Sequence, residues 1–410
     1  MRAATGASLI LFLLVTQSWA QDKGLKISGF SDITFENRSG DVADEEDLQL
    51  FEDGGGEEEL IEAGSRVTTP GFNLNLLGTL SESLIFQGEV AFSFEDEDFE
   101  IELLRSYIDY RIDPKFNLQA GKFLSSVGYL NRNQRSYSFL NYSVKARDLV
   151  NKEFGYLPSF TVGLKAYGSF ELGNTSALSY HVAYGGMRGL YPEAGETISG
   201  FEFAEDESNS GGTSLLLEYL TFIGNKELIV GLSGYRVPRI VGFSVEDGED
   251  VEIGEEADEL EEAGLLIREE MELSEMGFAP YLRLDGPKFQ VMFEYHLTHF
   301  EDQIGNLDNS DLHYSAYSLE FVYKTQLFGK PFYPYIRNDY RKIDDDHHYY
   351  GLEVEGEEEL VNAHVPNSKE VIFGFAYDVV SNNRIKMEYG RFLSGPYPEN
   401  SFRVSTSFAF

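Results

Sequence analysis

The residues best suited to metal chemistry in this sequence form a histidine and aspartate cluster near residue 345. His347 and His348 directly follow Asp344, Asp345 and Asp346. Imidazole nitrogens and carboxylate oxygens together can bind Zn²⁺ or a similar divalent ion. Because the spacing matches no fixed metal motif, a solvated loop is the alternative interpretation. We therefore treat Asp344, Asp346, His347 and His348 as metal-ligand candidates, and we expect no tightly held cofactor.

A hydrolytic site would need a nucleophile beside a base, and one short stretch offers these residue types. His313 lies near Asp311 and Ser315, but no nucleophile motif accompanies it. The sequence also has no glycine-rich phosphate-binding loop and no basic patch for nucleic acid. We therefore expect a protein that is not an enzyme and binds no nucleic acid, and a hydrolase is the enzymatic alternative.

A third set of chemically active residues consists of charges placed among apolar residues at every second position. Glu294, for example, lies between Phe293 and Tyr295 in a segment where the apolar residues share one parity. This period is typical of a β-strand with one apolar and one polar face. The same setting surrounds five other charged residues, namely Glu89, Arg105, Asp109, Arg111 and Arg337.

The alternating pattern recurs along most of the chain and predicts the elements that must position these charges. We count sixteen segments of about eight to twelve residues with strand character. They lie near 25–35, 71–81, 84–94, 101–112, 116–124, 159–171, 177–186, 213–222, 227–236, 276–285, 288–299, 314–325, 331–340, 369–378, 383–392 and 401–410.

The connections between these segments alternate in length. Seven are short and rich in Gly, Pro, Asn and Asp, which favour tight turns, and they lie at 81–83, 113–115, 172–177, 223–226, 285–288, 327–330 and 381–383. The interleaved connections are mostly long and polar, including 36–70, 125–158, 187–212, 237–275 and 341–368. With an even number of strands, both ends of the barrel domain lie on one side, as in a bacterial outer-membrane barrel.

These patterns predict an all-β fold, a transmembrane antiparallel β-barrel of about sixteen strands with short periplasmic turns and long acidic extracellular loops. In lipid every backbone amide needs a partner, so a spanning sheet must close on itself. Its outer side chains must be apolar, whereas those facing the lumen can be polar. A soluble sandwich or propeller is the alternative fold.

Residues 1–20 have the composition of a signal peptide. Arg2 supplies a positive charge, the apolar run from Leu9 to Val15 is too short to span a bilayer, and Ser18-Trp19-Ala20 precedes the expected cleavage site. A buried N-terminal helix is the alternative. We therefore predict export and a barrel domain over 21–410. The chain has no cysteine, which excludes a lipoprotein anchor and disulfides.

The final segment, SFRVSTSFAF, alternates up to Phe410. This ending is similar to the C-terminal signature of outer-membrane proteins, in which a final Phe is read by the barrel assembly machinery. The resemblance implies that this machinery is a partner through Phe410. Lipid and lipopolysaccharide of the outer membrane are the other expected partners.

The charged residues divide into a mixed lumen and an acidic mouth. Inward positions carry both signs: Lys26, Asp32, Glu89, Arg105, Asp109, Arg111, Lys165, Glu218, Arg283, Glu294, Arg337, Lys386 and Glu388. By contrast, 41–62 carries eleven carboxylates and no base, 246–275 carries fifteen against one Arg, and 344–359 carries eight. Such clusters concentrate cations and repel anions. Solvated loops, or loops that bind stabilising divalent ions, are the alternative interpretation.

The third long connection, 125–158, departs from the acidic trend. Its bases outnumber its acids, and they include Arg132, Arg135, Lys145 and Arg147. In general porins the third loop commonly folds into the barrel, and we expect the same here, with these bases facing wall carboxylates such as Glu89 and Asp109. A loop lying over the rim is the alternative.

Residues 105–139, RSYIDYRIDPKFNLQAGKFLSSVGYLNRNQRSYSF, carry the most specific family resemblance. The order strand, DPK turn, strand, GKF and VGYLN resembles the zinc-regulated outer-membrane protein family and, more loosely, phosphate-selective porins. The first resemblance implies a metal-responsive uptake or permeation protein.

Together these observations predict an outer-membrane porin that passes small hydrophilic solutes or ions by diffusion. A homotrimer and a preference for cations, including divalent metals, are further expectations. The alternative function is a surface barrel with a closed lumen that binds a metal or a partner.

Overall fold

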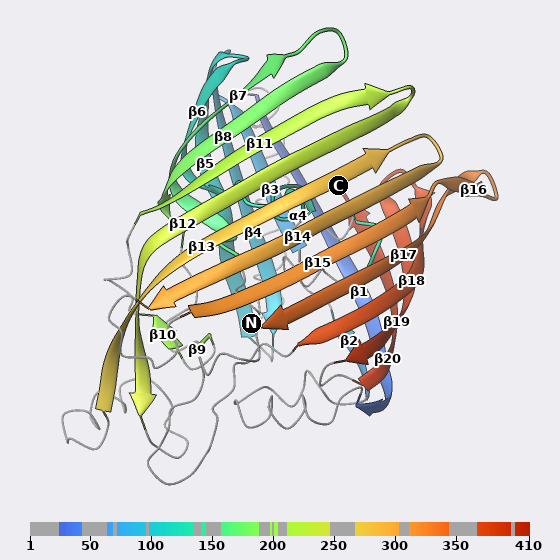
Figure 1. The fold of residues 1–410 in the computed structure, drawn as a ribbon. Helices are drawn as coiled ribbons and strands as arrows, with labels where there is room; N and C mark the ends of the chain where they lie inside the picture. Colours follow the sequence, from blue (N-terminus) through green and yellow to red (C-terminus); the bar gives the residue numbers. More distant parts are fainter. Residues whose placement is uncertain are drawn as a thin grey trace, which may run out of the picture.

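The structure is a computed structural model that describes residues 24–42, 64–68, 72–95, 98–134, 141–144, 157–187, 197–198, 201–203, 211–246, 267–302, 311–343, 367–394 and 398–410. Figure 1 shows tilted strands that follow one another around the wall of a barrel. The predicted signal peptide, most of the acidic loops and the candidate ligands Asp344, Asp346, His347 and His348 lie outside the described residues.

Sixteen strands in the described part of the chain form the wall, and each overlaps one of the segments predicted from the alternation. In chain order they are β1 (Leu25–Val42), β3 (Phe72–Thr79), β4 (Leu84–Glu95), β5 (Asp98–Asp113), β6 (Phe116–Leu124), β7 (Phe160–Glu171), β8 (Ser176–Gly186), β11 (Gly212–Ile223), β12 (Lys226–Glu246), β13 (Ile267–Asp285), β14 (Phe289–Asp302), β15 (Asp311–Tyr323), β17 (Lys330–Ile343), β18 (Ser368–Val380), β19 (Asn383–Ser394) and β20 (Pro398–Ala409).

Four short strands and a helical turn complete the described elements. They are β2 (Gly64–Thr68), β9 (Thr197–Ile198), β10 (Phe201–Phe203), β16 (Thr325–Leu327) and α4 (Tyr129–Gln134). Among the described residues, no helix is both long enough and apolar enough to cross a bilayer.

Each wall strand pairs antiparallel with the next one along the chain, and the last pairs with the first. The closing ladder of β1 and β20 begins at Phe30 and Ala409. It is extended by two backbone bonds between Gly29 and Phe410, of 2.9 and 3.0 Å. The prediction of a closed barrel without sheet edges is therefore confirmed.

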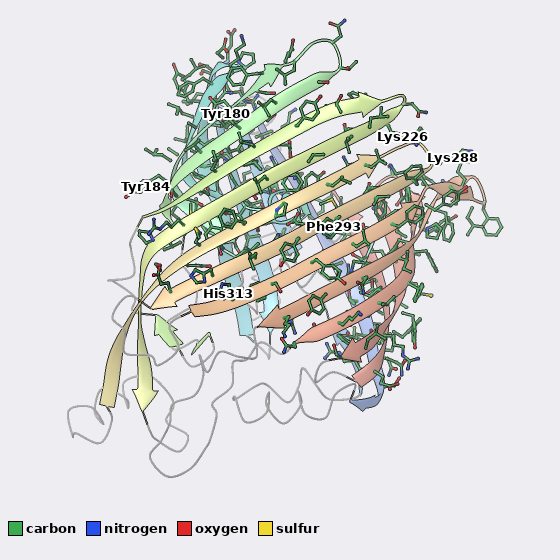
Figure 2. All side chains as sticks on the ribbon, viewed as in Figure 1. Tyr180, Tyr184, Lys226, Lys288, Phe293 and His313 are labelled. Carbon is green, nitrogen blue, oxygen red and sulfur yellow. The ribbon has the colours of Figure 1, made fainter. Side chains whose placement is uncertain are left out.

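The two faces of the wall are chemically opposite, because large apolar side chains point outward and charges point inward. On β14, Phe293 is 37% exposed on the outer surface (Figure 2), whereas the neighbouring Glu294 is fully buried. On β20, Phe402 and Phe408 are exposed, and the intervening Arg403 is buried. A continuous apolar exterior of this kind is stable only against lipid.

The short turns lie at the end of the barrel where β1 begins and β20 ends. Gly173 and Gly224 have φ values of 89° and 65°, a region that residues with a Cβ avoid, so these tight connections depend on glycine. Their position confirms the predicted alternation of turn and loop ends. By the usual orientation of such barrels this is the periplasmic end.

The wall differs in height around the barrel. β6 has 9 residues, about the minimum for a tilted spanning strand, whereas β12 has 21. The predicted strand 227–236 stopped just before Pro238, but β12 continues beyond an irregularity between Val237 and Ile240. Proline lacks an amide hydrogen and is accommodated at such a bulge, so it interrupts the ladder without ending the strand.

Candidate functional site

Inward carboxylates on the wall of β4–β7 pair with arginines of the same wall. Glu89 and Arg105 are direct cross-strand partners, with 2.5 Å between the Arg105 Nε and the Glu89 Oε2. Asp109 accepts bonds from Arg111, two residues along the same strand, at 3.1 Å and from the Tyr167 hydroxyl at 2.6 Å. These pairs place both signs of charge on one stretch of wall.

A second charged group lies across β17–β20 and β1. Arg403 contacts Glu36 at 2.6 Å, Glu388 at 3.2 Å and Glu370 at 3.5 Å. Arg337 lies 2.9 Å from Asp339. All are buried side chains, so each charge depends on its protein partners rather than on solvent.

The chain between β6 and β7 enters the barrel. We call residues 125–144 the inner segment, and its described parts are 125–134 and 141–144. The amides of Tyr129 and Leu130, at the start of α4, donate to the same carboxylate oxygen of Glu294 at 2.8 and 2.9 Å. Arg132 forms an ion pair with Glu218 and contacts the Tyr281 hydroxyl at 3.2 Å. Figure 1 shows α4 within the outline of the barrel.

Gly128 allows this close approach to the wall. Its φ is 72°, and a Cβ at this position would overlap a carboxylate oxygen of Glu294. Its amide donates to the Ser233 hydroxyl on β12 at 2.8 Å. A residue with a side chain would therefore be strained in its backbone and would also push α4 away from Glu294.

The second part of the inner segment contacts a different sector of the wall. The amide of Val144 donates to Glu388 at 2.8 Å, and Arg337 donates to the Ser143 hydroxyl at 2.7 Å. The Ser143 carbonyl accepts a bond from Lys386 at 3.2 Å.

Tyr142 packs near the periplasmic ends of β17 and β19. Its ring centroid lies 4.9 Å from that of Tyr333 and 5.3 Å from the guanidinium carbon of Arg384. Residue 384 is the second of β19, so the inner segment reaches down close to the turn end of the barrel.

These two sets of contacts place the described parts of the inner segment against different sectors of the lumen wall. The segment leaves the wall at the end of β6, and β17 is eight strands further along a closed wall of sixteen. Eight steps around sixteen lead to the opposite side. The second described part of the segment, 141–144, therefore lies against the side of the wall opposite the strand where the segment begins.

Protein contacts shape the ionisation of the inner segment. Burial raises the pKa of Tyr142 to about 12, so its hydroxyl stays neutral near pH 7. Burial alone would lower the pKa of Arg132, but Tyr281 and Glu218 outweigh it and the pKa is raised. Arg132 therefore stays charged, and its ion pair with Glu218 persists over the physiological pH range.

The predicted site residues have different outcomes. Arg132 does face a wall carboxylate, and this carboxylate is Glu218; Glu89 and Asp109 pair with Arg105 and Arg111 of the wall. Arg135, Lys145 and Arg147 lie outside the described residues. Glu294 and Arg337 are inward and contact the inner segment, while Arg111, with a 59% exposed side chain, lies near the turn end.

Sequence reasoning missed the inward tyrosines Tyr281 and Tyr335. Both share the parity of inward charges on their own strands, Arg283 and Arg337. An aromatic residue in the polar register was the available signal. The sequences of β13 and β17 alone, however, do not indicate which residues of other strands these two tyrosines contact.

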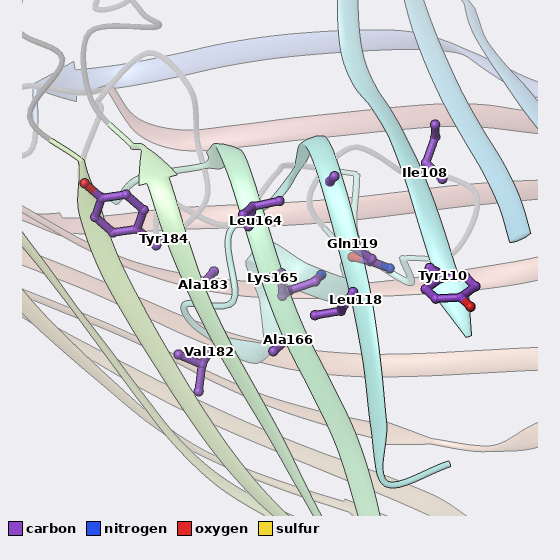
Figure 3. Close-up of a pocket in the computed structure, with 11 residues that line it drawn as sticks. Ile108, Tyr110, Leu118, Gln119, Leu164, Lys165, Ala166, Val182, Ala183 and Tyr184 are labelled. Atoms are coloured by element: carbon purple, nitrogen blue, oxygen red, sulfur yellow. The ribbon is translucent and has the colours of Figure 1, made fainter. Parts of the chain in front are cut away.

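A hollow of about 400 Å³ lies in the wall at β5–β8 (Figure 3). Its outward-facing lining is apolar and includes Leu118, Leu164, Val182 and Tyr184, and the small Ala166 leaves room between them. Because these side chains share the exposed parity, the hollow belongs to the lipid-facing surface. We therefore exclude it from the path of hydrophilic solutes.

Among the described residues, groups of three or more side chains placed to bind a metal are not found. The histidines that are described include His299 and His313, which face each other across β14 and β15 with ring centroids 4.6 Å apart. They lie on the lipid-facing parity at the loop end, and Figure 2 labels His313 there. They belong to the exterior rather than to the lumen.

Comparison with known proteins identifies the fold. No protein-family model and no curated protein match the chain. In fold it is similar to the trimer form of OmpT, an outer membrane protein of Vibrio cholerae, with 11% identity and a TM-score of 0.52 over 94% of this chain and 99% of that one. It is also similar to an anion-selective porin from Comamonas acidovorans, with 10% identity and a TM-score of 0.51 over 94% and 99% of the two chains. OprB of Pseudomonas putida has 11% identity and a TM-score of 0.51 over 96% of each chain. The protein therefore has the porin-like fold of a bacterial outer-membrane β-barrel, in agreement with its lipid-facing exterior.

Proposed function

We propose that this protein is an outer-membrane porin whose water-filled channel passes small hydrophilic solutes or ions by passive diffusion. The observation that supports this function best is the inner segment, whose two described parts contact separate sectors of a lumen wall lined by charges of both signs. A segment in this position narrows the path, so that width and field, rather than chemistry on the solute, select what passes.

The lining residues in this proposal are those that project from the wall or from the inner segment into the lumen. We assign the field in the channel to Glu89, Arg105, Asp109, Arg111, Glu294 and Arg337. We assign the constriction to Arg132 and, beyond the described residues, to Arg135, Lys145 and Arg147.

We also propose a preference for cations. Inward carboxylates of β4–β7 pair with wall arginines, whereas the connections on the loop side carry a large excess of carboxylates. A negative mouth raises the local concentration of cations, including divalent ones. We likewise propose divalent-metal transport and a metal-responsive role, both of which the zinc-regulated resemblance implies. We also propose a metal site at Asp344, Asp346, His347 and His348.

The test is single-channel recording of the purified protein in a planar bilayer. We expect stepwise currents and, in a KCl gradient, a reversal potential of the sign given by K⁺ selectivity. Replacement of 126–158 by a short turn should enlarge each step. A Cl⁻-selective channel would overturn the cation preference, and an unchanged step in the deletion variant would overturn the constriction.

A second candidate function is a surface binding barrel with a closed lumen. It is favoured by the near-complete burial of Arg337, Lys386 and Glu388 where the inner segment covers them. In that case the acidic loops would bind a metal or a partner, and stepwise current would be absent from the native protein.

A homotrimer is also proposed. The OmpT structure of Vibrio cholerae reported above is a trimer form, and its similarity to this chain is one of fold only. Chemical cross-linking in native outer membranes should then give a band of three times the monomer mass, and monomers alone would contradict the proposal. Lipopolysaccharide contact and recognition of Phe410 by the barrel assembly machinery stay predictions.

A further inference from the structure

Two places on the wall that hold the inner segment share one construction. At the first, Glu218, Gly231 and Tyr281 are direct register partners on the consecutive strands β11, β12 and β13. At the second, Glu388, Gly374 and Tyr335 are direct register partners on β19, β18 and β17. Each is a row of glutamate, glycine and tyrosine across three neighbouring strands.

Within each row the tyrosine lies over the glycine and reaches the glutamate beyond it. A Cβ on Gly231 would overlap the ring of Tyr281, and a Cβ on Gly374 would come within 2.7 Å of the ring of Tyr335. The Tyr281 hydroxyl donates to Glu218 at 2.6 Å, and the Tyr335 hydroxyl donates to Glu388 at 2.7 Å. The glycine is what allows a tyrosine to reach across two strand spacings.

In both rows the same carboxylate also receives the inner segment. Glu218 accepts a hydrogen bond from the guanidinium of Arg132, and Glu388 accepts one from the amide of Val144 at 2.8 Å. The carboxylate oxygen that takes the tyrosine hydroxyl is the one that takes the inner segment, Oε2 in each case. The hydroxyl therefore fixes the orientation of the group that holds the segment.

The two rows also lie at matching depth. Gly231 is five residues after Lys226, the first residue of β12, and Glu388 is five residues after Asn383, the first residue of β19. Five tilted strand residues rise by about 12 Å, so both rows stand at about that height above the turn end. They belong to different sectors of the wall, β11–β13 and β17–β19.

We propose that these two rows are brackets that fix the inner segment at both of its described parts and thereby set the width and selectivity of the channel. Tyr335 is a positioning residue, because it acts through Glu388, whereas Tyr281 acts through Glu218 and also accepts a hydrogen bond from Arg132. The proposal deepens the proposed porin function and rests on it for its effect on transport, whereas the position of the segment can be tested without current.

The chain contains a matched control. Tyr235 lies over Gly277, its direct partner on β13, but the row ends at Thr298 instead of a glutamate. Its hydroxyl contacts Glu275 at 2.5 Å and Thr298 at 3.3 Å, and both residues belong to the wall. Tyr235→Phe removes the same atom from the same kind of tyrosine and glycine pair.

The experiment compares Tyr281→Phe, Tyr335→Phe, the double variant and Tyr235→Phe. Each keeps the ring that covers the glycine, and barrel folding is checked by resistance to SDS without heating. Amide hydrogen exchange of Leu130 and Val144 reports the position of the segment, and planar-bilayer recording reports conductance and reversal potential.

We expect Tyr335→Phe to speed exchange at Val144, whose amide shares the Glu388 oxygen. We expect Tyr281→Phe to speed exchange at Leu130, which lies in α4 together with Arg132. Each change should be roughly tenfold, the lower end of the range for loss of a hydrogen bond to a charged group. Both should increase the conductance step and shift the reversal potential, most of all when combined, and Tyr235→Phe should resemble the native protein. Faster exchange in a protein that never conducts would keep the brackets and overturn the porin function. Normal exchange and unchanged currents in the double variant would overturn the brackets and leave the porin function standing.

Discussion

Two sectors of the wall use the same residue types in different ways. On β4–β7 the inward carboxylates are neutralised by the wall itself, as in the direct pair of Glu89 and Arg105. On β11–β14 and β17–β19, Glu294 and Glu388 accept backbone amides from the inner segment. The difference shows that an inward carboxylate can either stabilise the wall or hold what lies inside it. The location of its partner, rather than its own type, decides which.

The largest effect that separates the sectors should come from replacing one buried carboxylate in each. Glu388→Gln weakens contacts to Arg403, Tyr335 and Val144 at once. Loss of one partner from a buried ionic group costs about 3 kcal/mol or more. Glu89→Gln should cost less, because the side chain of Arg105 retains 15% exposure to solvent. Urea unfolding in lipid vesicles measures both. Equal losses of stability would contradict the distinction between the sectors.

A change in the inner segment alone should be the next largest. Gly128→Ala combines a strained φ, about 1 to 3 kcal/mol, with overlap against Glu294. We expect faster amide exchange at Tyr129 and Leu130 and larger conductance steps, with the barrel still folded. Gly64→Ala is the control, because a Cβ there meets no atom within 4 Å. If both variants behave alike, α4 does not depend on Gly128.

Salt can sharpen the comparison between the acidic mouth and the lumen. The Debye length falls from about 10 Å at 0.1 M salt to about 3 Å at 1 M. A cation preference that comes from the exposed loop carboxylates should decline over this range, whereas a preference set by buried lumen groups should persist. Reversal potentials at a fixed concentration ratio, recorded from low to high total KCl, measure it. A constant preference would locate selectivity inside the barrel.

The smallest effect should come from a solvent-exposed ion pair near the turn end of β4–β7. Arg111→Gln removes a 59% exposed side chain from Asp109, which keeps its 2.6 Å bond from Tyr167. A pair this exposed contributes about 0.5 kcal/mol. Stability should therefore change little, while loss of one inward positive charge should shift the reversal potential slightly toward cations. Substantial loss of stability would mean that this sector depends on its exposed pairs.

Much of the wall could be predicted from the sequence, because lipid on one side and polar groups on the other impose a strict period of two. All sixteen wall strands follow that period in the segments where they were expected. The ends on the loop side were less predictable. β13 begins at Ile267, nine residues before the predicted strand, and Glu269, Glu270 and Glu272 conceal its alternation.

The candidate site was only partly predictable. The basic composition of 125–158 indicated an inner loop, and Arg132 does meet a wall carboxylate. Its partner Glu218 could not be deduced, because the register of β11, β12 and β13 depends on turn lengths and pairing rather than on local spacing. The same register brings Tyr281 over Gly231, a contact between residues fifty positions apart.

The connection that contains the inner segment joins two adjacent strands, β6 and β7. β6 and β7 remain paired from Asn117 and Tyr167 up to Leu124 and Phe160, so the hydrogen-bonded ladder does not rely on the chain that joins them. The segment inside the lumen can therefore be replaced without changing the pairing of the wall strands around it. For design, one shell can be given a new interior and hence new permeability. For evolution, the interior can diverge quickly while the shell stays the same.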